Sequence, residues 1–147
     1  MKTLSFNRIL YVLINVFVGI LVLLKGADYH PDSYAFLEMA FNRSPVYNIF
    51  LKIFTSVFGD KFELPLIIVQ YGFAVIAIYY FLNAIKKSFD ISFLWLIMIQ
   101  LILLAPYVYL HFVANAILSE AIAYPLFLIL FSLLLKTFVK EDLKYIF

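Results

Sequence analysis

The stretch that decides the fold is Lys25 to Gly59, KGADYHPDSYAFLEMAFNRSPVYNIFLKIFTSVFG. It is the one long polar part of a chain of 147 residues that is 66% hydrophobic. A soluble domain is about half apolar, so one small core cannot hide the excess. Apolar runs long enough to enter a bilayer flank the stretch on both sides. We therefore predict that residues 25–63 form an outer loop between the first two membrane helices.

The apolar runs predict an all-α, polytopic membrane protein that is a single membrane domain over residues 1–147. The four predicted spans are residues 6–25, 64–85, 91–109 and 117–135. No cleavage site of small residues follows the first run, and three more apolar runs come later, which favours a retained anchor over a signal peptide. The formal net charge of +2 does not suggest nucleic acid as a partner, and the absence of cysteine excludes disulfides and thiolate metal sites.

The basic residues favour an orientation with both termini in the cytoplasm. Four crossings place most of them on the cytoplasmic side, namely Lys2, Arg8, Lys86, Lys87, Lys136, Lys140 and Lys144. The outer side receives Lys25, Arg43, Lys52 and Lys61, together with most of the acidic residues. The polar loop and its acids are thus expected on the outer face.

The outer loop is expected to contain two helices. Ser44 and Pro45 are typical of a helix start, apolar residues then recur at helical spacing, and Gly59 is a stop signal, which predicts an amphipathic helix over 45–58. Such a helix either lies flat in the interface or packs on its own membrane bundle. A shorter helix over 33–41 is expected before it, capped by Asp32 or Ser33.

Asp28, His30 and Asp32 follow the first membrane helix directly. A carboxylate at the membrane–water boundary is suited to act as a general base, because partial burial raises its proton affinity. A helix cap is the alternative role for Asp32, and an ordinary solvated loop acid is the alternative for Asp28. A divalent metal bound by Asp28, His30 and Asp32 is an open alternative, and the pattern makes no cofactor certain.

Glu120 is the other unusual acid, at the outer start of the fourth apolar run, where a charge is costly if it faces lipid. It either faces a polar cleft shared with His111 and Asn115 or is a first-turn acid stabilised by the helix dipole. Arg43 either clamps a phosphate or is simply solvated. We include Glu120, Arg43, His111, Lys25 and Tyr34 as candidate substrate-binding residues.

The order of these features resembles the amino-terminal part of the GT-C-type integral membrane glycosyltransferases, which include relatives of protein mannosyltransferases and aminoarabinose transferases. The matching features are Asp32-Ser33 with Ala40 in the first outer loop, Ser44-Pro45-Val46-Tyr47 opening an amphipathic helix, Gly59, Gln70, and Leu118-Ser119-Glu120 opening a later helix. The resemblance implies that Asp32, or else Asp28, is the catalytic acid/base residue, and that Ser119 and Glu120 lie near the site.

The resemblance also implies partners and a location. They are the lipid bilayer, a polyprenyl-phosphate sugar donor and a glycan, lipid or protein acceptor, in a bacterial inner membrane. Full-length members have many more membrane helices, so the chain is expected to be an amino-terminal part of such an enzyme or one piece of an assembly. The alternative is a non-enzymatic four-helix scaffold or partner subunit. A small multidrug-type transporter is less well supported, because the first two spans carry no carboxylate.

Overall fold

The computed structural model describes residues 2–38, 45–109 and 113–145, and these are helical without any strand. The α-helices are α1 (Lys2–Lys25), α2 (Pro31–Leu37), α3 (Pro45–Phe58), α4 (Glu63–Phe89), α5 (Phe93–Leu104) and α6 (Glu120–Tyr145). Two short 3₁₀ helices, η1 (Gly59–Lys61) and η2 (Ala105–Tyr107), follow α3 and α5. The predicted all-α class is confirmed for the part of the chain described.

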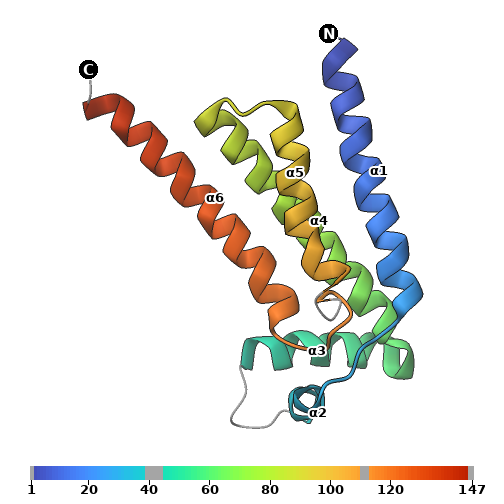
Figure 1. Ribbon diagram of the computed structural model, residues 1–147. Helices are drawn as coiled ribbons and strands as arrows, with labels where there is room; N and C mark the ends of the chain where they lie inside the picture. Colours follow the sequence, from blue (N-terminus) through green and yellow to red (C-terminus); the bar gives the residue numbers. More distant parts are fainter. Residues whose placement is uncertain (1, 39–44, 110–112, 146–147) are drawn as a thin grey trace.

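Helices α1, α4, α5 and α6 run up and down in chain order, and α2 and α3 gather at one end (Figure 1). Figure 1 shows α3 lying across the ends of these helices, with α2 beyond it. The start of α1 and the end of α6 lie at the opposite end. We call the end with α2 and α3 the loop end and the other the terminal end.

Among the residues that the structure describes, two helices are long and apolar enough to cross a membrane, judged by length and composition. They are residues 63–89 of α4 and residues 120–138 of α6. The apolar parts of the other two are shorter, Ile9–Lys25 and Phe93–Tyr107. At about 1.5 Å per α-helical residue and about 2 Å per 3₁₀ residue, α5 with η2 reaches roughly 24 Å, less than a hydrocarbon core of about 30 Å. The structure therefore supports two spanning helices, and the four-span arrangement stays a prediction.

Two helix starts differ from the sequence-based prediction. The helix predicted over 33–41 is α2, which begins at Pro31 and has His30 as its N-cap. Asp32 lies one residue after Pro31, so the predicted cap role of Asp32 is wrong; proline fixes the first helical position and moves the cap to the residue before it. Ser33 acts as a partner of the cap, because its Oγ accepts the His30 backbone N–H at 2.9 Å.

The fourth apolar helix also starts later than predicted, at Glu120 instead of residue 117. Ile117 lies before the helix, and its N–H donates to the carbonyl oxygen of Asp28 at 3.3 Å. The first bonds of the helix run from the Ala121 N–H to the Leu118 carbonyl, and from the N–H groups of Ile122 and Ala123 to the Ser119 carbonyl. The segment before α6 is therefore paired with the loop after α1, and the helix begins three residues beyond the predicted start.

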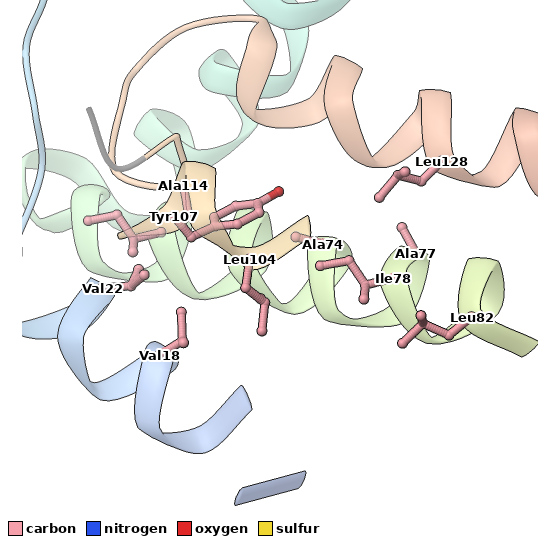
Figure 2. Close-up of a cluster of buried hydrophobic side chains, with 11 residues drawn as sticks. Val18, Val22, Ala74, Ala77, Ile78, Leu82, Leu104, Tyr107, Ala114 and Leu128 are labelled. Atoms are coloured by element: carbon pink, nitrogen blue, oxygen red, sulfur yellow. The ribbon is translucent and has the colours of Figure 1, made fainter. Parts of the chain in front are cut away.

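Helix α4 is the centre of the bundle. Ala74, Ala77 and Ile78 on α4 are fully buried, and the two alanines leave room for Leu128 of α6 (Figure 2). On the other side, Val18 of α1 and Leu104 of α5 complete the same cluster (Figure 2). Small residues at such contacts let helices approach closely, which favours association inside a membrane.

A second apolar cluster attaches the loop end to the bundle. Phe36 of α2, Tyr47 and Leu51 of α3, and Leu66 of α4 are all buried in it. The other side of α3 exposes an apolar stripe of Val46, Ile49, Ile53 and Val57. Helix α3 therefore packs on its own bundle and also presents an apolar face of the kind that suits a bilayer surface.

Candidate functional site at the loop end

Asp28 joins the first loop to the segment before α6. Its N–H donates to the Asn115 carbonyl at 2.9 Å, and its carbonyl accepts the Ile117 N–H, which makes a parallel bridge between Asp28 and Ala116. Ala116 precedes Glu120 by four positions, so the two acidic regions singled out from the sequence meet at the loop end. This pairing connects the end of α1 with the start of α6.

The Asn115 side chain also connects the segment before α6 to the end of α1. Its Nδ2 donates to the carbonyl oxygens of Val22 at 2.7 Å and Gly26 at 2.6 Å. Helix ends leave carbonyl groups without intrahelical partners, and an amide donor at this place satisfies them. Gly26 has φ of +73°, a left-handed conformation that ends α1 and that glycine adopts without strain. Asn115, expected in the cleft of Glu120, is instead a cap for α1.

The Asp28 side chain is partly buried and lies close to a cation. Its Oδ2 is 4.0 Å from Nζ of Lys25, the last residue of α1, and the side-chain exposures are 28% and 44%. Because Lys25 is exposed, this ion pair contributes little stability. The pair places an amine next to a carboxylate at the loop end.

The remaining loop candidates are more open to solvent. Asp32 is exposed in the first turn of α2. Tyr34 is 58% exposed, and its ring stacks on Tyr29 with 6.0 Å between the centroids. No group of three His, Asp or Glu side chains able to hold a metal occurs among the described residues. Asp28, His30 and Asp32 therefore do not converge on a metal site in this conformation.

Tyr29 forms a contact that the sequence did not suggest. Its hydroxyl donates to a carboxylate oxygen of Glu63, the first residue of α4. Burial of part of the ring raises the pKa of the Tyr29 hydroxyl, and the bond to Glu63 and the charge of Glu63 raise that pKa further. The bond links the loop after α1 to the start of α4. Tyr29 and Glu63 are 34 positions apart, so no local sequence pattern predicts this hydrogen bond.

Glu120 lies on the rim of a polar group formed by three helices. It is exposed, and it accepts a hydrogen bond from Ser119 Oγ at 3.3 Å. Nearby, Gln70 Nε2 of α4 donates to Tyr47 Oη of α3 at 2.9 Å. Burial is the main cause that raises the pKa of the Tyr47 hydroxyl; a bond from Gln70 opposes it, and the negative charge of Glu120 adds to it. Glu120 is thus close enough to Tyr47 for its negative charge to affect the proton affinity of the Tyr47 hydroxyl.

An apolar cavity of about 710 Å³ opens beside this polar group. Helices α3, α4 and α6 line it, with Val46, Phe50, Phe73, Ile122 and Leu126 among its walls. Tyr47 and Ser119 supply polar atoms at its loop end. Cavities of roughly 300–1,000 Å³ with mostly apolar walls and a few polar groups are typical of sites for small molecules.

The structure therefore brings Asp28, Lys25 and the Ser119–Glu120 pair to one end of the bundle, and it leaves Asp32 and Tyr34 on the open side of α2. Arg43 and His111 lie outside the described residues. Tyr29, Glu63 and the Tyr47–Gln70 pair were not predicted as site residues. Comparison of the chain with protein-family models, with characterised proteins and with solved structures returned no match in any of the three.

Proposed function

We propose that this chain is the amino-terminal part of a membrane glycosyltransferase that moves a sugar from a polyprenyl-phosphate donor to an acceptor at the outer face. The observation that carries the proposal is the bridge between Asp28 and Ala116. It joins the acidic loop to the start of α6, next to an apolar cavity suited to a lipid chain. Ala116 and Ser119 are three residues apart, at most roughly 10 Å of extended chain.

The membrane arrangement is part of the proposal. Helices α1, α4, α5 and α6 cross the bilayer, α1 with the help of its amino-terminal turns and α5 together with η2. The loop end faces outward, and the terminal end lies in the cytoplasm of a bacterial inner membrane. The exposed lysines Lys86 and Lys87 at the end of α4 support this orientation, since basic residues favour the cytoplasmic side.

Asp28 fits the role of general base better than Asp32, because it is partly buried and pinned through its backbone. In the proposed step, the acceptor hydroxyl oxygen attacks the anomeric carbon, and Asp28 takes the hydroxyl proton. The bond between that carbon and the phosphate oxygen breaks, and the polyprenyl phosphate leaves with the bonding electron pair. The amine of Lys25 stabilises the negative charge on this phosphate. In this proposal, Glu120 binds sugar hydroxyl groups, whereas Tyr34, which is exposed on α2, has no assigned role in the step.

The test is Asp28→Asn in the full-length protein, assayed as transfer of labelled sugar from a polyprenyl-phosphate hexose or pentose in membranes. A lost general base lowers the rate by roughly 100-fold or more. The matched control is Asp60→Asn, an exposed acid of η1 at the same end. If transfer by Asp28→Asn equals transfer by the control at equal protein level, Asp28 is not the base. If Asp32→Asn alone abolishes transfer, the base is Asp32.

The alternative function is that of a non-enzymatic partner subunit, and one observation favours it. Helix α5 exposes large apolar side chains along its length, including Leu94, Trp95, Leu101 and Ile102. Lipid or the helices of another protein can cover this face. Crosslinking from a photoreactive residue at position 95 distinguishes them: a defined crosslinked protein together with no transfer activity supports the subunit.

A further inference from the structure

A second cavity, of about 450 Å³, lies between α1, α4 and α5, away from the loop end. Gln100 in its lining is fully buried, and Gln100 Nε2 donates to the carbonyl of Tyr11, which also lines the cavity, at 3.3 Å. Phe93, the first residue of α5, and Lys86, in the last turn of α4, line it near the terminal end. Phe93 and Gln100 are seven positions apart, about 10 Å along a helix, so the cavity is elongated along the bundle.

The inner wall and the mouth of this cavity differ in chemistry. Leu82, Leu96 and Ile97 supply apolar walls. Lys86 is exposed at the mouth, and Asn83 lies one turn of α4 deeper. The cavity therefore suits an amphiphile whose apolar body lies between the helices and whose anionic group meets a lysine amine at the surface.

The charge around the mouth favours an anion. Lys87 is exposed beside Lys86, and Lys136 of α6 lies at the same end with Nζ 3.5 Å above the Tyr80 ring. Among the side chains that the structure describes, Asp90 is the acid at this end, whereas the other acids lie at the loop end. A basic residue near a membrane surface contributes about 1 kcal/mol to the binding of acidic lipid, which is roughly fivefold in affinity.

We propose that this cavity binds one acyl chain of an acidic phospholipid from the leaflet at the terminal end, with the lipid phosphate held by Lys86. Neutral phospholipids, whose head groups carry a cation beside the phosphate, bind less tightly. The proposal rests on the membrane placement argued above and does not depend on sugar transfer or on Asp28.

The test is native mass spectrometry of the full chain released from detergent micelles that contain dioleoyl phosphatidylglycerol and dioleoyl phosphatidylcholine in equal amounts. We expect the wild type to retain phosphatidylglycerol about fivefold over phosphatidylcholine. Lys86→Glu removes this preference, whereas Lys87→Glu, a neighbour that does not line the cavity, lowers the preference only in part. Ile97→Trp fills the cavity and abolishes retention, whereas Met98→Trp on the exposed face keeps it.

Three results overturn the proposal. They are equal loss in Lys86→Glu and Lys87→Glu, unchanged retention in Ile97→Trp, and no lipid preference in the wild type. Equal loss in the two lysine variants, or unchanged retention in Ile97→Trp, would mean that surface charge and not the cavity binds the lipid. Circular dichroism verifies that each variant is folded, and Leu96→Trp replaces Ile97→Trp if that variant does not fold. Asp28→Asn retains the lipid like the wild type, which separates this test from that of the transferase.

Discussion

Asn115 Nδ2 lies 2.7 Å from the carbonyl oxygen of Val22, although the two residues are 93 positions apart. This bond attaches the segment before α6 to the last turn of α1. The neighbouring backbone pairing of Asp28 repeats the attachment on the other side of Gly26. Together they fix the position of the acidic loop relative to Glu120, so the geometry of the candidate site depends on a buried amide.

The first prediction concerns this amide. Asn115→Ala leaves the Val22 and Gly26 carbonyl groups without their side-chain donor, and we expect it to destabilise the protein by about 1–3 kcal/mol. Thr137→Ala is the matched control, because Thr137 Oγ1 donates only to the carbonyl four residues earlier on an exposed helix face. The measurement is the thermal midpoint in detergent. Equal midpoints for the two variants would show that the Asn115 bonds contribute nothing to stability.

The second prediction uses two glycines. A Cβ on Gly19 of α1 lies 2.9 Å from Cε1 of Tyr71 on α4. The Tyr71 ring cannot easily move away, because its hydroxyl donates to the Asn15 carbonyl at 2.6 Å. We expect Gly19→Ala to cost about 1–3 kcal/mol through overpacking.

Gly72→Ala, where a Cβ meets no heavy atom within 4 Å, is the control. It is expected to be neutral or to stabilise α4 by up to about 1 kcal/mol, since alanine favours helix. The same thermal measurement compares the two. A Gly19→Ala variant as stable as Gly72→Ala would contradict the packing of α1 on α4.

The sequence predicted the helices far better than the contacts between them. Residues 45–58 are α3 as expected, because Pro45, the apolar repeat and Gly59 are local signals. The cap of α2 also had a local signal, since proline at the first helical position points to His30 as the cap. The sequence-based prediction instead named Asp32 or Ser33 as the cap, because aspartate and serine are preferred at cap positions.

The candidate site was predicted only in part, for a physical reason. Asp28 and Glu120 could be recognised as unusual acids from their positions at the ends of apolar runs. Their meeting at one end depends on the Asp28–Ala116 pairing, which is a tertiary contact without a local pattern. The exposure of Asp32 follows from the place of Pro31, and the Tyr29–Glu63 bond follows from how the loop folds over the start of α4.

The third prediction is a pH dependence at Tyr29. Its pKa in the folded protein is raised above the ordinary value of about 10, so its contribution to stability is complete below about pH 10. Above that pH the unfolded chain loses the Tyr29 proton before the folded protein does, and stability falls as the pH rises.

Tyr29→Phe should therefore make the loss of thermal stability between about pH 9 and 11 shallower than in the wild type. The control is Tyr109→Phe, whose side chain is 84% exposed. The effect is small because Tyr29 itself is partly exposed. If both variants lose stability as steeply as the wild type does, the bond to Glu63 is not maintained in solution.

The central claim is that the loop end and the terminal end lie on opposite sides of a membrane, and the chain contains no cysteine that would complicate labelling. The most direct test is labelling of intact cells with a membrane-impermeant maleimide, using the single variants Lys61→Cys on η1 and Lys87→Cys at the end of α4, both exposed. The account predicts that position 61 is labelled in intact cells and that position 87 is labelled only after the membrane is opened. Labelling of both positions from the same side, or of position 87 alone in intact cells, would contradict it.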